Sequence, residues 1–221
     1  MNGRRNYGNP CGVARSLDVV GERWALLVVR DLLLGPKRFN DLLAGLPGVS
    51  PNVLSQRLRD LADHGVVHRR ELGAPARVHY YELTEWGREL EPLLLQLGRW
   101  GNQAPHPVEG ELGVDSIMLS IKAAFDAVRA DELRGTYEFR IDADTFVAEV
   151  ADASLRIYRG TAEHPDAVLA TGIETLRAVC DGRRSLDDAA RTADLRLDSD
   201  RAEATVHLSE LLMAPFSPQT S

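Results

Sequence analysis

The sequence contains few of the residues on which disulfides and membrane spans depend. Its 221 residues include only two cysteines, Cys11 and Cys180, and these lie far apart in the chain. The longest apolar run, Trp24–Val29, is much shorter than the roughly 20 residues that cross a bilayer. The first residues lack the apolar core of a secretory signal. We therefore expect a cytoplasmic protein without structural disulfides and without a membrane partner.

The short motifs of cofactor and metal chemistry are also missing. The chain has no G-x-G-x-x-G, no G-x-x-x-x-G-K-S/T, no H-E-x-x-H and no paired C-x-x-C, so nucleotide and zinc sites lack their usual signatures. The six histidines are scattered along the chain. We expect no cofactor, no metal ligands, no catalytic residues and no enzymatic activity, although a catalytic triad can assemble from residues distant in sequence.

The chain does contain two segments of opposite charge. Residues 1–103 have 14 basic and 11 acidic residues, a net charge of +3, whereas residues 104–221 have 12 and 22, a net charge of −10. The first segment can approach phosphate, and the second is repelled by it. Between them, a short polar stretch contains two prolines and two glycines. The sequence therefore predicts domains at 1–103 and 115–221, joined by a linker at 104–114.

The first segment has the pattern of a winged helix-turn-helix domain. Helical periodicity recurs over Val13–Val20, Glu22–Leu34, Phe39–Leu46, Pro51–His64 and Glu85–Gly101. A tight turn containing glycine joins the third and fourth of these blocks, which is typical of a helix-turn-helix. Residues 66–72 and 77–83 alternate like two strands around a Gly-Ala-Pro-Ala tip, and they predict a β-wing.

The fourth block is predicted to be the recognition helix. Ser50 suits its N-cap and Pro51 its first turn, and leucines fall on one face while polar residues fall on the other. Asn and Gln suit adenine, and Arg suits guanine. A solvated helix face would show the same pattern, but the wing and the short helix before it favour DNA. The candidate DNA-binding residues are Lys37, Arg38, Ser50, Asn52, Ser55, Gln56, Arg59, Arg69 and Arg77. Of these, Lys37, Arg38, Arg69 and Arg77 are expected to contact phosphate, together with Arg70 beside the wing tip.

Several of these runs carry a family resemblance. Gly21–Trp24, Arg30–Gly35, Leu54–Leu61, Gly65–Val67 and Tyr81–Thr84 closely resemble the HxlR-type branch of the MarR-like winged-helix regulators. The similarity covers about residues 8–102 and implies a dimeric regulator that binds double-stranded DNA. The leucines of the fifth helical block spread over more of the helix surface than the single apolar face that a small domain buries. This excess of apolar surface supports a homodimer. The alternative is that the linker or the second domain covers them.

The second segment predicts an α+β domain. Helical patterns at its start and end bracket consecutive strand-like runs, so we expect a sheet with one face covered by helices. Leu133–Phe139, Tyr158–Gly160, Pro165–Leu169 and Thr175–Gly182 resemble sterol-carrier-protein-like domains, which implies an apolar cavity and a hydrophobic small-molecule effector. Its candidate lining residues are Phe125, Tyr137, Phe139, Phe146, Leu155, Ile157, Leu176 and Leu208. Taken singly, each of these residues suits a packed core equally well.

Cys11 offers an alternative mode of sensing. It follows Pro10 near the start of the first helix, where a helix N-terminus favours a reactive thiolate. The resemblance implies the same role, because several HxlR-type regulators sense oxidants or electrophiles through an N-terminal cysteine. A small apolar side chain at a dimer contact is the other interpretation. The sequence thus predicts a DNA-binding transcriptional regulator with a ligand-sensing second domain; the alternative is a redox or electrophile sensor acting through Cys11, with a structural second domain.

Overall fold

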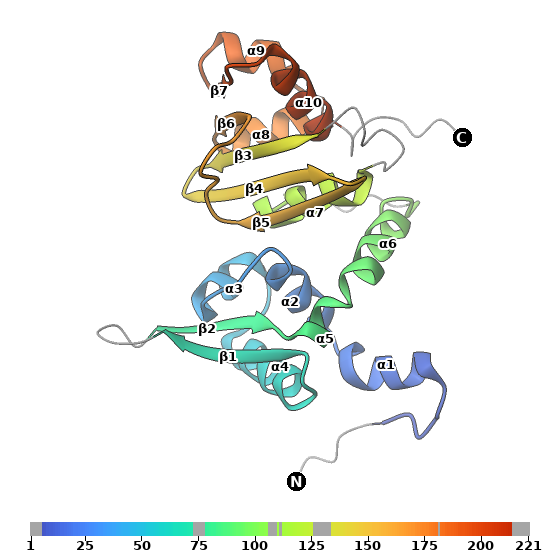
Figure 1. The fold of residues 1–221 in the computed structure, drawn as a ribbon. Helices are drawn as coiled ribbons and strands as arrows, with labels where there is room; N and C mark the ends of the chain where they lie inside the picture. The colour runs from blue at the N-terminus through green and yellow to red at the C-terminus, as the bar shows by residue number, and fades with distance from the viewer. Residues whose placement is uncertain are drawn as a thin grey trace. The chain divides into compact units, whose positions relative to one another are not determined.

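The computed structural model divides the chain into two compact units, Met1–Leu94 and Leu95–Ser221 (Figure 1). The structure describes residues 6–72, 78–105, 110, 112–125, 134–180 and 182–213. Within these ranges no helix combines the length and the apolar character that crossing a membrane requires.

The first unit is a winged helix-turn-helix. Its elements are α1 (Gly12–Val20), α2 (Ala25–Leu32), α3 (Phe39–Gly45), α4 (Pro51–Asp63), β1 (Val67–Leu72), β2 (Val78–Leu83), α5 (Glu85–Arg88) and the start of α6 (Glu91–Gly101). Strands β1 and β2 pair antiparallel, with Val67 opposite Leu83. Lys37 and Tyr81 exchange backbone hydrogen bonds of 3.0 and 2.8 Å, which attach the segment before α3 to the wing. The predicted helix-turn-helix and wing are therefore confirmed.

The hydrophobic core of this unit holds α4 against α2 and the wing. Leu54, Leu58 and Leu61, spaced along one face of α4, are at most 2% exposed. They belong to one cluster with residues of α2, such as Val28 and Val29. Burial of a leucine side chain contributes about 1.5–3 kcal/mol relative to exposure. This packing fixes which face of α4 points away from the unit.

Two helix boundaries differ from the predicted ones. Helix α2 begins at Ala25 rather than Glu22 because Trp24 adopts a left-handed conformation with a φ of 78°, which a helix cannot contain. The predicted helix over Glu85–Gly101 is divided into α5 and α6. Pro92 explains the break, since in a continuous helix its ring would clash with the carbonyl of Arg88, four residues earlier.

The second unit contains a five-stranded mixed sheet with helices. After α7 (Val114–Ala124) come β3 (Gly135–Ile141), β4 (Asp144–Ala151), β5 (Ser154–Arg159), β6 (Ala167–Thr171), α8 (Ile173–Cys180), α9 (Leu186–Arg191), β7 (Leu195–Asp198) and α10 (Ala202–Met213). The strand order is β5-β4-β3-β6-β7, and the β3–β6 pair is parallel. An α+β architecture was predicted, but β6, β7, α9 and the parallel pair were not.

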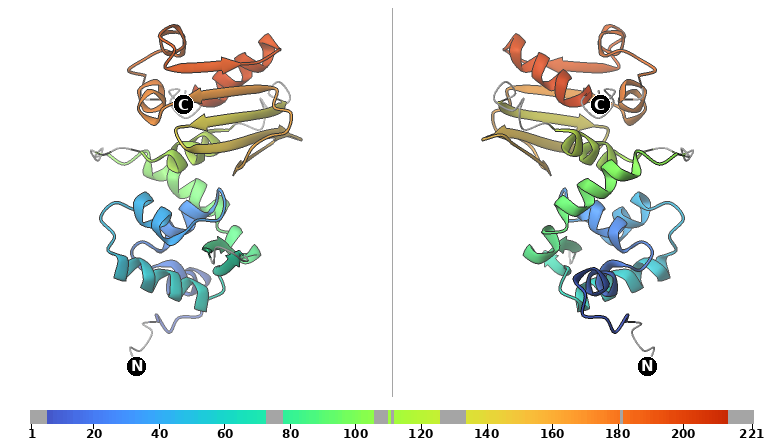
Figure 2. Two further views of the ribbon diagram at one scale, coloured as in Figure 1. Left: turned by 90° about the vertical axis from the view of Figure 1, so that its left-hand side faces the viewer. Right: turned by 90° about the vertical axis from the view of Figure 1, so that its right-hand side faces the viewer.

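One face of this sheet forms the core of the unit. In the β3–β4 register Phe139 lies opposite Phe146 and Tyr137 opposite Ala148, so these side chains share a face, and all four are fully buried. Helices α7 and α10 contact each other and lie on the same side of the sheet (Figure 2). Phe125, one of the candidate lining residues, follows the end of α7 with a ψ of 127°, outside the helix.

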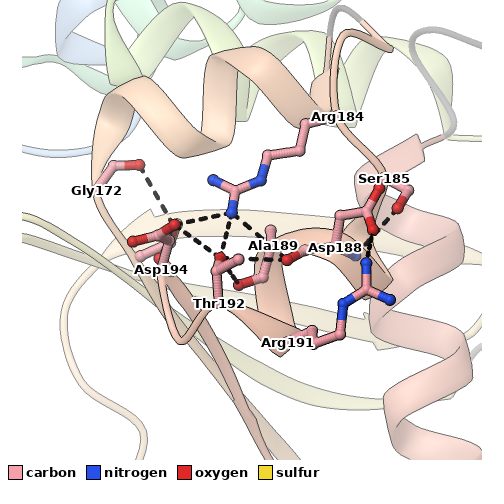
Figure 3. A network of polar contacts seen from close by, with 9 residues as sticks. Gly172, Arg184, Ser185, Asp188, Ala189, Arg191, Thr192 and Asp194 are labelled. Carbon is pink, nitrogen blue, oxygen red and sulfur yellow. Dashed lines mark hydrogen bonds and ion pairs between the residues drawn. The ribbon is translucent and has the colours of Figure 1, made fainter.

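A polar network fixes the position of α9 beside β7. Ser185 caps the helix by accepting a hydrogen bond from the Asp188 backbone N–H at 3.0 Å. The Arg184 guanidinium donates to Thr192 and, at 2.8 Å, to Asp194, as Figure 3 shows. This hydrogen bond lowers the pKa of Asp194. The network joins both ends of α9 to the segment that leads into β7.

Candidate DNA-binding surface

The outward face of α4 carries most of the predicted base-contacting residues. The turn before the helix contains Gly48, whose φ of 87° favours glycine. The Ser50 hydroxyl then accepts a hydrogen bond from the Val53 N–H at 3.4 Å, which makes Ser50 a helix cap in addition to a candidate contact. Asn52, Gln56 and Arg59 are exposed, opposite the buried leucines. Ser55 is half-buried on the flank of this face.

A chain of hydrogen bonds connects the polar side chains of α4. Arg59 donates to the Gln56 side-chain oxygen at 2.9 Å, and the Gln56 amide donates to Asp60 at 2.7 Å. Asp60 also forms a 3.2 Å ion pair with Arg57, which lies 3.7 Å from Glu22. Asp60 was not among the predicted site residues. Asp60 lies four residues after Gln56, and side chains at this spacing are neighbours on a helix. This spacing was the feature of the sequence that indicated the contact. Asp60 holds the Gln56 amide in one orientation.

Arg38 and Tyr80 form a second exposed pair, next to the wing. The Arg38 guanidinium donates to the Tyr80 hydroxyl through Nε at 3.1 Å and through Nη2 at 2.9 Å, and it lies 5.3 Å from the ring centroid. The hydrogen bond to Tyr80 raises the pKa of Arg38. This pairing joins residues 42 positions apart, so no local pattern identified Tyr80. The charged and hydroxyl groups together suit a phosphate oxygen.

The arginines of the wing differ in their surroundings. Arg69 and Arg70 are both exposed on β1. Arg70 lies 3.6 Å from Glu82, a buried carboxylate that also contacts His68 at 2.7 Å. Arg77, the remaining predicted phosphate contact of the wing, lies outside the described residues.

Lys37, a predicted phosphate contact, is buried in the structure, whereas a phosphate contact needs an exposed ammonium group. The residue is only 6% exposed, and its ammonium nitrogen lies 3.8 Å from the carboxylate of Asp31, which is 1% exposed. Asp31 also accepts hydrogen bonds from Arg30 at 2.8 and 2.7 Å. The sequence could not show this, because a lysine beside an arginine has the same local pattern whether it is buried or exposed. Lys37 is part of the interior of the first unit.

A groove lies between α1 and the α5–α6 region of the first unit. Its volume is about 370 Å³, and its lining includes Val19, Trp86, Leu90 and Leu93. Trp86 and Leu93 are 51% and 64% exposed. Cys11 precedes α1, and its free thiol is exposed, whereas Cys180 is buried in the second unit.

The candidate ligand residues of the second unit form its interior. Seven of the eight are at most 4% exposed, namely Tyr137, Phe139, Phe146, Leu155, Ile157, Leu176 and Leu208, and Phe125 is half-buried. The buried Tyr137 hydroxyl donates to the Arg134 carbonyl at 3.2 Å and lies 3.3 Å from His207 Nδ1. Burial raises the pKa of Tyr137 to about 12. The structure thus brings these residues together, with one polar group among them.

Comparison with known proteins matches the first unit. The family profile described as HxlR-like helix-turn-helix covers residues 19–108. The uncharacterized HTH-type transcriptional regulator YybR of Bacillus subtilis is 39% identical over 92 residues, which are 41% of this chain and 73% of that protein. The regulator sll1512 of Synechocystis, described in the same words, is 38% identical over 96 residues, 43% of this chain and 70% of that one. The chain belongs to the HxlR-like helix-turn-helix family.

Among solved structures, the redox regulator HypR in its oxidized form is 35% identical and covers 44% of this chain and 100% of its own, with a TM-score of 0.42. The HxlR-like profile ends before β3, so the sheet of the second unit lies outside it. The family therefore accounts for the winged helix-turn-helix of this chain and leaves the second unit to be explained from its own residues.

Proposed function

We propose that this HxlR-like protein is a transcriptional regulator that binds duplex DNA sequence-specifically through α4. The exposed row of Asn52, Gln56 and Arg59, on a helix whose other face is anchored in the core, is the observation that carries this proposal. These side chains can donate and accept hydrogen bonds at base edges in the major groove. Arg38, Tyr80 and Arg69 lie in the segment before α3 and on the wing, where they can contact phosphates beside the groove.

Binding of the full-length protein to duplexes selected from a random library tests this proposal. We expect Arg59→Ala and Gln56→Ala each to reduce discrimination at one base position by about 1–3 kcal/mol. Arg69→Ala should weaken binding to all DNA sequences alike. It should also lower by about one the salt slope, which is the slope of log affinity against log salt concentration. Arg196→Ala, which removes an exposed arginine of β7, is the matched control and should change neither. Wild-type binding without sequence preference would refute the proposal.

The proposed regulator acts as a homodimer through α1 and α6. On α6, Leu93, Leu97 and Trp100 are 64%, 46% and 72% exposed at helical spacing, and Val13 and Leu17 of α1 are also exposed. Apolar surface of this extent usually marks an interface. Leu97→Glu should convert a dimer into a monomer in sedimentation equilibrium, whereas Val206→Glu, at an exposed valine of α10, should not. A wild-type protein that sediments as a monomer would contradict this part.

For the second unit we propose the binding of a hydrophobic small molecule, in the manner of the sterol-carrier-protein-like domains. The support is the set of aromatic and aliphatic side chains on the inner sheet face, with the Tyr137 hydroxyl among them as a polar group that can orient a ligand. Mass spectrometry of the purified full-length protein under native and then denaturing conditions would identify a retained ligand. A ligand that favours one dimer geometry by about 1–3 kcal/mol would change operator affinity about 5–150-fold. Tight ligand binding with unchanged operator affinity would refute sensing.

A further inference from the structure

Helix α4 exposes one large hydrophobic side chain that its packing does not explain. Val53 is 39% exposed, whereas the three leucines that anchor the helix are at most 2% exposed. It is the third residue of α4, immediately after Asn52 and one helical turn before Gln56. Val53 therefore lies at the N-terminal end of the recognition helix, which is the part that contacts base edges in helix-turn-helix proteins.

The conformation of Val53 is fixed before any DNA is bound. The Ser50 hydroxyl accepts a hydrogen bond from its backbone N–H, so the first turn of α4 is closed around it. A valine in a helix has one strongly preferred χ1 rotamer. The two methyl groups thus occupy a defined position beside the polar row, and no side-chain entropy has to be lost when they make contact.

Only one base offers an apolar partner in the major groove. Thymine carries a C5-methyl group there, while the other bases present hydrogen-bond donors and acceptors to that groove. An exposed valine cannot satisfy a donor or an acceptor, and placing it against one costs free energy. Contact with the thymine methyl instead removes apolar surface of both groups from water.

We propose that Val53 is a specificity-determining residue that contacts the C5-methyl group of a thymine in the operator. The inference rests on the proposed function, since it assumes that α4 enters the major groove. Loss of the methyl contact removes about one buried methyl group, which corresponds to roughly a fourfold decrease in affinity. A recognition face defined by polar side chains alone does not include Val53.

The test combines a variant of the protein with a variant of the DNA. Each thymine of a selected operator is replaced in turn by deoxyuridine, which lacks only the C5-methyl group, and affinity is measured by fluorescence anisotropy for the full-length protein. The same series is repeated with Val53→Ala. The control is Val206→Ala, which removes the same atoms from an exposed valine of α10.

We expect one deoxyuridine substitution to weaken wild-type and Val206→Ala binding about fourfold and to leave Val53→Ala binding unchanged. Circular dichroism of Val53→Ala checks that the helix content is retained, and an exposed Val→Ala change in a helix should not lower it. If no deoxyuridine substitution lowers the affinity, or if the loss of affinity is the same in all three proteins, Val53 does not contact a thymine methyl. Wild-type protein that selects no sequence at all would overturn the proposed function together with this inference.

Discussion

Replacement of Lys37 by methionine separates a structural role of this residue from a role in DNA binding. Methionine retains the apolar stem and removes the charge. At 3.8 Å, the attraction between the Lys37 ammonium and the Asp31 carboxylate amounts to about 4 kcal/mol at an effective dielectric constant of about 20. Breaking a buried ion pair costs about 3–5 kcal/mol because the remaining charge is uncompensated. Here Arg30 still donates two hydrogen bonds to Asp31, so we expect a loss of about 2–3 kcal/mol in the free energy of unfolding.

Urea unfolding followed by tryptophan fluorescence measures this loss. Trp24 and Trp86 belong to the first unit, so most of the tryptophan signal reports the unit that contains Lys37. With a urea m-value of about 1–2 kcal/mol/M, the midpoint of Lys37→Met should fall by about 1.5 M. Protein concentration is held constant in all measurements, because the proposed dimerisation would shift apparent stability.

Arg38→Met is the matched control, since it removes a cation from the neighbouring, exposed position. It should change the free energy of unfolding by less than about 1 kcal/mol and lower the salt slope of DNA binding by about one. Lys37→Met should leave that slope unchanged at temperatures where it remains folded. Our reasoning is wrong if Lys37→Met keeps the wild-type midpoint and loses one unit of salt slope, because Lys37 would then contact phosphate.

Three further predictions follow from other sites. A Cβ at Gly87 would overlap the Val66 carbonyl oxygen, so Gly87→Ala should destabilise the first unit by about 3 kcal/mol in urea unfolding; an unchanged midpoint would contradict this packing. Tyr137 has a pKa of about 12, above that of a tyrosine in an unfolded chain, so the folded state retains its proton longer and stability should fall as the pH rises from about 10 to 12. Tyr137→Phe should remove that part of the alkaline loss, and an identical pH profile for both proteins would refute the assignment. Finally, a thiol reagent should modify Cys11 rapidly and Cys180 only on unfolding; equal rates in peptide mass mapping would show that Cys180 is accessible.

The features that were predictable from the sequence are those indicated by residue patterns within one short segment. A helix was predicted at 51–64 and is observed as α4, Pro51–Asp63, because its cap, its first-turn proline and its leucine spacing all lie within one segment. The pairing of β1 with β2 followed from two alternating runs separated by a short tip. The consecutive strand-like runs expected in the second segment are also local patterns, and the structure shows β3, β4 and β5 there as antiparallel neighbours.

Features set by contacts between distant segments were missed. Strand β6 is short and pairs parallel with β3, about 30 residues earlier in the chain, and a parallel pair needs no turn signal near either strand. The partnership of Arg38 with Tyr80 depends on the backbone bridge between Lys37 and Tyr81. The division of the last helix of the first unit was predictable in principle, because Pro92 was visible in the sequence.

Ion pairs within the first unit affect how much positive charge it presents to DNA. Its net positive charge allows the first segment to approach phosphate, yet three of its cations are paired within the unit itself: Lys37 with Asp31, Arg57 with Asp60, and Arg70 with Glu82. These pairs reduce the charge that the unit presents to phosphate. Affinity for DNA should therefore depend on a few exposed positions around α4 and the wing. The proposed mode of binding therefore predicts a modest salt slope, with discrimination mainly through the side chains on the outward face of α4.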